Sequence, residues 1–184
     1  MWSLESLMRA GCRPCIVVVP SEHVATAREL TGGDAEVVPG GNTRQASVYA
    51  GLQRVRSPCV VVHDAARPLA SSALVQAVVA AAARADGAVA ALPVDETLKR
   101  VVEGGVDTTI ERAGLWATQT PQAFDTEKLR SAHERARARG LGATDDAQLI
   151  EQMGGTIVIV EGERSNLKLT RPGDFAVAEA LLRS

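Results

Sequence analysis

The sequence predicts an α/β fold with a doubly wound, mostly parallel sheet. Two observations indicate it. Short runs of β-branched and small apolar residues recur along the chain, and segments with helical spacing of apolar residues separate them. The run at 60–62 is three valines, as is typical of a parallel strand covered on both faces. We expect a single domain over residues 1–184, since no linker, repeat or low-complexity segment interrupts the pattern.

The composition argues against several classes of partner. The net charge is −2 and aromatic residues make up 3%, which disfavours nucleic acid. No apolar run approaches the roughly 20 residues of a membrane span, and the first residues lack the pattern of a signal peptide. Three cysteines cannot form a disulfide framework, so we expect a cytoplasmic protein. Cys12 and Cys15 have C-x-x-C spacing, but no second ligand pair follows, and incidental thiols are favoured over a metal or redox site.

Each element of the first half has a local signal. A helix over residues 2–10 ends at Gly11, and a strand follows over 15–19. Ser21 is the expected N-cap of the next helix, which ends near Leu30. The remaining elements are a short strand over 35–38, a helix after the glycines at 40–41 with Val48 and Leu52 inward, and the strand 60–63.

The second half continues the alternation with one interruption. We expect a helix capped by Ser71, a strand over 87–93, a charged, exposed helix over 126–139, a helix from Thr144 to Met153, a core strand over 156–160, an alternating strand over 165–170 and a terminal helix opening at Arg171-Pro172. The interruption is a β-hairpin of residues 97–102 and 106–110 with Gly104-Gly105 at its turn. A two-stranded hairpin is marginal alone, so this arm, about residues 95–113, needs a surface to lie against, such as another subunit.

An acid and a cation follow the valine run, as His63-Asp64-Ala65-Ala66-Arg67-Pro68. Ligands of open α/β sheets bind just beyond the carboxyl ends of strands. Asp64 there can hold a hard divalent cation, and Arg67 can bind phosphate oxygens. The alternative is an ordinary polar turn in which Asp64 caps the next helix, and this stretch alone does not decide between them.

Two further segments have both a functional and a structural interpretation. Gly40 and Gly41 before a helix allow close approach of a ligand and leave free N–H groups directed at it, whereas a merely flexible loop would use the same residues. Asp145 and Asp146 open a helix, where acids complement the helix dipole, so stabilisation of that helix is the default interpretation of both.

Seven motifs in order resemble one family. They are Gly40-Gly41-x-x-Arg44-x-x-Ser47-Val48, Val62 to Pro68, Thr97-Leu98-Lys99, Glu111 to Leu115, Gln119-Thr120-Pro121-Gln122, Thr144 to Ala147, and Lys168-x-Thr170-x-Pro172. Together they resemble 2-C-methyl-D-erythritol 4-phosphate cytidylyltransferase of non-mevalonate isoprenoid biosynthesis. The resemblance implies a Rossmann-like nucleotidyltransferase fold whose β-hairpin is a dimerisation arm. It implies an enzyme that joins CTP to methylerythritol phosphate and releases pyrophosphate, by in-line attack of a phosphate oxygen on the α-phosphorus.

The resemblance also implies a site and a cofactor. Asp64, Arg112 and Lys168 would be catalytic, and Asp64 would hold Mg²⁺. The methylerythritol phosphate would contact Arg67, Thr97, Arg112, Thr120, Thr144 and Lys168. The nucleotide would contact Gly40, Gly41, Asn42, Ser47, Asp64, Ala65 and Lys168.

The chain departs from the family at its beginning. The family has an earlier strand and glycine-rich loop that bind the triphosphate, and Met1 aligns in the helix after them. We therefore predict poor CTP binding and negligible turnover, with residues 15–19 and 60–63 either paired directly or separated by a groove. A CDP-ribitol-forming relative and a non-catalytic remnant are the alternative functions.

Overall fold

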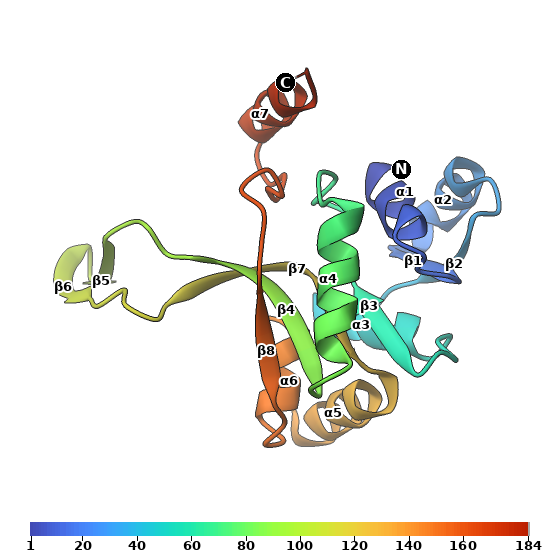
Figure 1. The fold of residues 1–184 in the computed structure, drawn as a ribbon. Helices are drawn as coiled ribbons and strands as arrows, with labels where there is room; N and C mark the ends of the chain where they lie inside the picture. The colour runs from blue at the N-terminus through green and yellow to red at the C-terminus, as the bar shows by residue number, and fades with distance from the viewer. Residues whose placement is uncertain (184) are drawn as a thin grey trace.

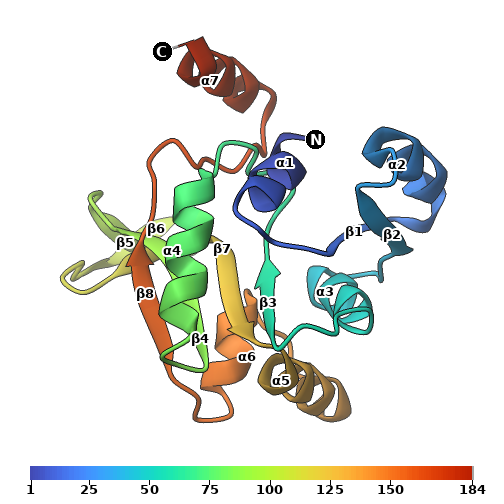
Figure 2. The ribbon, with the colours of Figure 1, turned by 45° about the vertical axis from the view of Figure 1, so that its right-hand side comes forward.

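The computed structural model describes residues 1–183 and places helices on both faces of a sheet (Figures 1 and 2). The helices are α1 (Trp2–Arg9), α2 (Val24–Thr31), α3 (Arg44–Leu52), α4 (Ser72–Ala82), α5 (Thr126–Arg139), α6 (Asp146–Glu151) and α7 (Pro172–Arg183), with one 3₁₀ turn, η1 (Ser21–His23). The strands are β1 (Cys15–Val19), β2 (Ala35–Pro39), β3 (Cys59–Val62), β4 (Gly87–Pro93), β5 (Leu98–Val102), β6 (Gly105–Ile110), β7 (Trp116–Asp125) and β8 (Ile157–Glu161).

The strands of the body form two hydrogen-bonded groups. The first is the parallel pair β1-β2, and the second is a four-stranded sheet in the order β3-β7-β4-β8. In the second group β7 runs antiparallel to both neighbours, while β4 and β8 are parallel. The predicted α/β fold with a mostly parallel sheet is confirmed, and β7 is its antiparallel strand.

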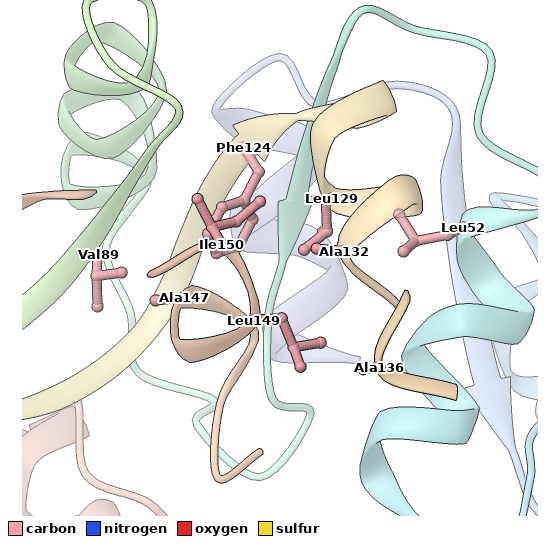
Figure 3. Close-up of a cluster of buried hydrophobic side chains, with 9 residues drawn as sticks. All are labelled: Leu52, Val89, Phe124, Leu129, Ala132, Ala136, Ala147, Leu149 and Ile150. Atoms are coloured by element: carbon pink, nitrogen blue, oxygen red, sulfur yellow. The ribbon is translucent and has the colours of Figure 1, made fainter. Parts of the chain in front are cut away.

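Alternate residues of β4 face two different layers, which explains its almost complete burial. Ala88 and Ala90 pack with α4, whose apolar residues form one core cluster. Val89 faces the other way, into a cluster that also holds Phe124 of β7 and Leu52 of α3 (Figure 3). That second cluster is completed by Leu129, Ala132 and Ala136 of α5 and by Ala147, Leu149 and Ile150 of α6.

The β7 strand, which lies in the middle of the four-stranded sheet, is not among the strands that the sequence predicts. Residues 119–122 of this strand read Gln-Thr-Pro-Gln, and a proline inside a polar run argues against a central strand. The pairing with β4 shifts register between Val89 and Ala91, opposite this segment. The strand is therefore irregular where it carries its polar residues.

Several predicted elements need correction. Residues 165–170 form no strand, because the segment leaves the sheet after β8 and follows the loop beyond β3, where the Leu169 N–H donates to the Ala66 carbonyl at 2.8 Å. Ser21 lies in η1 and makes no capping hydrogen bond. The α5 helix is charged but not simply exposed, since it buries Leu129, His133 and three further residues.

The hairpin β5-β6 projects from the body as an arm (Figure 1). Its strands carry exposed apolar residues, Val101, Val102 and Val106. The turn is made by Glu103 and Gly104, which both have positive φ, so the predicted Gly104-Gly105 turn is off by one residue. This is the backbone pattern of the tight turns that match the twist of a hairpin.

The β1 and β3 strands are not paired with each other. Within residues 1–183, β1 pairs with β2 only and β3 with β7 only. Direct pairing, one of the two expected arrangements, is therefore wrong, and β3 is an edge strand of its sheet rather than a central one. Its residues are only partly buried for the same reason. None of the described helices is long and apolar enough to cross a membrane.

Candidate active site

Asp64 lies just beyond the carboxyl end of β3, as the sequence predicts. Its backbone N–H donates to Thr120 Oγ1 of β7 at 3.0 Å, which ties the turn to the neighbouring strand. The side chain is 17% exposed. The carboxylate is thus mostly withdrawn from water but still reachable.

Two cations hold this carboxylate. Lys168 Nζ lies 2.8 Å from Asp64 Oδ2, and Arg44 Nε lies 3.3 Å from Oδ1. Burial alone would raise the pKa of Asp64, but the hydrogen bond from Lys168 and the charge of Arg44 outweigh it and leave the pKa below its ordinary value. Asp64 is therefore a carboxylate at neutral pH.

Arg44 is the residue that the sequence analysis left without a role. It begins α3, whose N-cap Thr43 accepts a hydrogen bond from the Ala46 N–H. Besides Asp64, its guanidinium binds Asp146 through NH1 at 2.7 Å. Burial alone would lower the pKa of Arg44. The charges and hydrogen bonds of Asp146 and Asp64 outweigh burial and raise the pKa above its ordinary value, so the side chain stays charged. Its position in the Gly-Gly-x-x-Arg motif was the available signal.

The two acids that open α6 have different environments. Asp145 is the N-cap and accepts from the Gln148 N–H at 3.0 Å, so the predicted helix-stabilising role is confirmed for it. Asp146 is 1% exposed and points into the protein, between Arg44 and His133. A role limited to the helix dipole is therefore wrong for Asp146.

A hydrogen-bonded network holds the turn after β3. Thr120 Oγ1 lies 3.0 Å from His63 Nδ1, and His63 Nε2 lies 3.0 Å from the Arg67 carbonyl oxygen. Burial lowers the pKa of His63, which favours the neutral ring, and burial also lowers the pKa of Arg67. The Asn166 side chain donates to the Thr120 carbonyl at 2.8 Å, and the Asn166 backbone carbonyl accepts from Arg67 NH1 at 2.7 Å.

The glycine segment packs too closely against α3 for larger residues. A Cβ on Gly41 would lie 2.6 Å from Ala46 Cβ, and a Cβ on Gly40 would lie 2.7 Å from Ser47 Oγ. The Gly41 N–H donates to Ser47 Oγ at 3.2 Å. These contacts show that the two glycines are needed for packing against α3, so the loop is not merely flexible, and binding of a ligand there stays a prediction. Asn42 and Ala65 are exposed at this end of the molecule.

Within residues 1–183, three of the predicted site residues make no hydrogen bond or ion pair with Asp64. Thr97 and Arg112 line a hollow at the base of the arm with Thr109, Ile110 and Glu111, and no contact within residues 1–183 joins them to Asp64. Thr144 is exposed and hydrogen-bonds Gln148. One chain therefore brings together Asp64, Lys168, Arg67 and Thr120, but not the arm residues.

The side chains available as metal ligands limit how a divalent cation could bind. No group of three His, Cys, Asp or Glu side chains is arranged around a metal position in the described part of the chain. Mg²⁺ in phosphate-transferring sites is commonly held by one or two carboxylates together with substrate phosphates. Asp64 fits that mode as the single protein ligand, and Lys168 can then turn to the phosphates while Arg44 keeps its contact with Asp64.

A carboxylate flanked by two cations at the end of a strand, beside a glycine loop that opens a helix, defines an α/β enzyme that handles phosphorylated ligands. Comparison with known proteins identifies the family. The model of the 2-C-methyl-D-erythritol 4-phosphate cytidylyltransferase family matches residues 1–184, and the chain belongs to that family.

Individual relatives agree. The cytidylyltransferase of Bacillus pumilus is 49% identical over 180 residues, which cover 94% of this chain and 79% of that protein. That of Bacillus licheniformis is 47% identical over 150 residues, which cover 81% of this chain and 65% of the relative, just under two thirds of its length. The crystal structure of the Thermus thermophilus cytidylyltransferase superposes with a TM-score of 0.90 at 40% identity, covering 100% of this chain and 88% of that one. The predicted family is confirmed, its members in this comparison are named as cytidylyltransferases, and a CDP-ribitol-forming relative is not favoured.

Proposed function

We propose that this chain catalyses its family's reaction, the joining of CTP and 2-C-methyl-D-erythritol 4-phosphate, at a site centred on Asp64. The observation that carries the proposal is the Asp64 carboxylate between Lys168 and Arg44. These three groups form an arrangement that can exchange partners when phosphates arrive: Lys168 moves to the substrates and frees Asp64 Oδ2 for a metal ion, while Arg44 stays on Oδ1.

The reaction needs positioning and charge stabilisation more than covalent help. A phosphate oxygen of methylerythritol phosphate attacks the α-phosphorus of CTP, the bond from that phosphorus to the bridging oxygen breaks, and pyrophosphate leaves. Lys168 and Arg67 orient the attacking phosphate, and Lys168 also reaches the nucleotide phosphates. Mg²⁺ bound by Asp64 would supply neutralisation of the phosphate charge.

The nucleotide would lie against the loop before α3. Gly40 and Gly41 add no side chain to this loop and pack closely against α3, and Ser47 keeps the loop in place by its hydrogen bond to Gly41. Asn42 and Ala65 would complete this surface. Thr120 and Thr144 would lie near the sugar phosphate, as the resemblance implies.

We further propose a homodimer in which the arm of one chain completes the site of the other. Thr97 and Arg112 lie away from Asp64 in their own chain, and the arm carries exposed valines without cover. A second copy would bury those valines and bring both polar residues to a methylerythritol phosphate. Three free thiols suit a reducing compartment, so we place the enzyme in the cytoplasm.

The experiment is product formation by the chain and by Asp64→Asn at millimolar CTP and Mg²⁺, where weak CTP binding does not limit the rate. In line with the low turnover predicted from the sequence, we expect slow formation of the cytidylylated product from methylerythritol phosphate with the unaltered chain, and at least about a hundredfold less with Asp64→Asn. Near-equal rates would remove Asp64 from the chemistry. Product from ribitol 5-phosphate instead would favour the CDP-ribitol alternative, and no product from either would favour a non-catalytic remnant.

A further inference from the structure

A buried, hydrogen-bonded histidine–aspartate pair lies behind the site and has no place in the chemistry above. His133 of α5 is 0% exposed and Asp146 is 1% exposed, and His133 Nε2 lies 2.9 Å from Asp146 Oδ1. Because a carboxylate can only accept, Nε2 carries the hydrogen of this bond. The other ring nitrogen, Nδ1, is buried and has no hydrogen-bond partner within residues 1–183.

Stability alone does not account for this pair. Burying a carboxylate and a polar ring away from water costs free energy, and well-packed apolar residues of similar volume are often equally stable or more so. The unpartnered Nδ1 adds a further cost. Because the buried pair costs free energy, we look for a role in fixing the positions of neighbouring side chains.

The geometry connects the pair to the reacting centre. Asp146 uses its two oxygens separately: Oδ1 accepts from His133, and Oδ2 lies 2.7 Å from Arg44 NH1. Arg44 in turn lies 3.3 Å from Asp64 Oδ1 through its Nε. His133 is thus the first member of a chain of contacts that ends on the proposed catalytic carboxylate.

The ring of His133 is itself held in place. Tyr49 of α3 stacks on it with ring centroids 6.0 Å apart and an interplanar angle of 30°. The Arg137 guanidinium lies 4.4 Å from the centroid of Tyr49, and the Tyr49 hydroxyl donates to Glu134 at 3.4 Å. The imidazole therefore cannot swing freely, and its N–H has a defined direction.

We propose that His133 is a positioning residue, which orients the Asp146 carboxylate so that Arg44 is held against Asp64. Without the His133 hydrogen bond, Asp146 can rotate and Arg44 loses its fixed approach to Asp64 Oδ1. Small misplacements of this kind reduce the rate of the chemical step while leaving ground-state binding largely intact. The proposal rests on the proposed function only for its kinetic consequence.

The test uses three replacements of one residue. Gln places an amide N–H near the position of Nε2, Asn is one methylene too short to do so, and Leu preserves bulk without any donor. For His133→Leu and His133→Asn we expect kcat to fall about tenfold with KM for methylerythritol phosphate within about twofold, and for His133→Gln most of the rate to return. Tyr49→Phe is the matched control, since it removes the hydroxyl contact and keeps the ring.

A second measurement does not depend on turnover. The Nε–H of Arg44 should give a protected side-chain NMR signal in the unaltered chain, in His133→Gln and in Tyr49→Phe, and an exchanging one in His133→Asn and His133→Leu. If the unaltered chain makes no product, the proposed function fails, while this signal still decides the role of His133. Should His133→Leu not fold, the comparison of Asn with Gln remains. Equal behaviour of Asn and Gln in both measurements would overturn the proposal.

Discussion

At the scale of single residues, Asp64 and His63 are chain neighbours that are both largely buried but end in opposite charge states. Burial favours the uncharged form of both. Asp64 overcomes it because Lys168 and Arg44 contact its two oxygens, so its pKa is lowered and it stays ionised. The hydrogen bond from His63 to the Arg67 carbonyl does not compensate for burial, so its pKa is also lowered and the ring stays neutral.

His63 therefore gives the protein a pH-dependent stability. Its pKa in the folded state lies below the value of 6.5 expected for an unfolded chain. Between these values the unfolded chain binds the proton more readily, so the contribution of neutral His63 is complete above pH 6.5 and is lost as pH falls through the folded-state pKa. Urea unfolding at several pH values should show the difference in stability between the unaltered chain and His63→Asn shrinking below pH 6.5. A constant difference would contradict this, and the exposed His23→Asn is the control.

Gly41 is a position where a single methyl group should matter. Its Cβ would lie 2.6 Å from Ala46 Cβ, a contact fixed by the first turn of α3. We expect Gly41→Ala to cost about 1–3 kcal/mol of stability, and CTP affinity to fall about tenfold as the loop moves. Gly142→Ala, with nothing within 4 Å of its Cβ, should stay within about 0.5 kcal/mol. Calorimetric unfolding and CTP titration measure both, and equal effects of the two changes would refute the packing argument.

At the scale of elements, Ser71 is the cap that orders the start of α4. Its Oγ accepts from the Leu74 N–H at 3.0 Å and donates to Glu163, whose other oxygen accepts from the Ser71 N–H at 3.1 Å. We expect Ser71→Ala to cost about 0.5–2 kcal/mol in urea unfolding. Ser21→Ala, which removes a serine without a capping hydrogen bond, should cost no more than about 0.5 kcal/mol. A cost for Ser21→Ala as large as that for Ser71→Ala would contradict these assignments.

Elements with clear local signals were predictable from the sequence. The bounds of β1, β4 and α5 agree with the predicted ranges, because apolar runs and terminal glycines mark them. The β7 strand was not predictable, since its polar residues bond to partners far away in the sequence: Thr120 to His63, and the Gln122 side-chain N–H to Asp145. In the site, Asp64, Arg67 and Lys168 followed from position and resemblance. His133 had no sequence signal, because its partner Asp146 comes from the next helix.

At the scale of the whole molecule, the projecting arm is the feature that a single chain leaves unexplained. Val106 is 65% exposed on it and Val101 is 57% exposed. If these residues lie in a dimer interface, Val106→Glu should raise the dissociation constant at least about tenfold by burying an unpaired charge. Leu30→Glu is the matched control, as Leu30 is also 65% exposed but lies on α2. Light scattering over a concentration series measures both, and a monomer throughout would remove the proposed dimer.

The most direct test of the account mixes two inactive chains. If each site takes Asp64 from one chain and Arg112 from the other, a dimer of Asp64→Asn with Arg112→Ala contains one intact site and one doubly altered site. Random mixing of equal amounts should then restore about a quarter of the activity of the unaltered protein. Rates are measured at fixed CTP, methylerythritol phosphate and Mg²⁺ after the chains have exchanged. The account predicts that recovery, and a mixture as inactive as either parent would contradict a site shared between two chains.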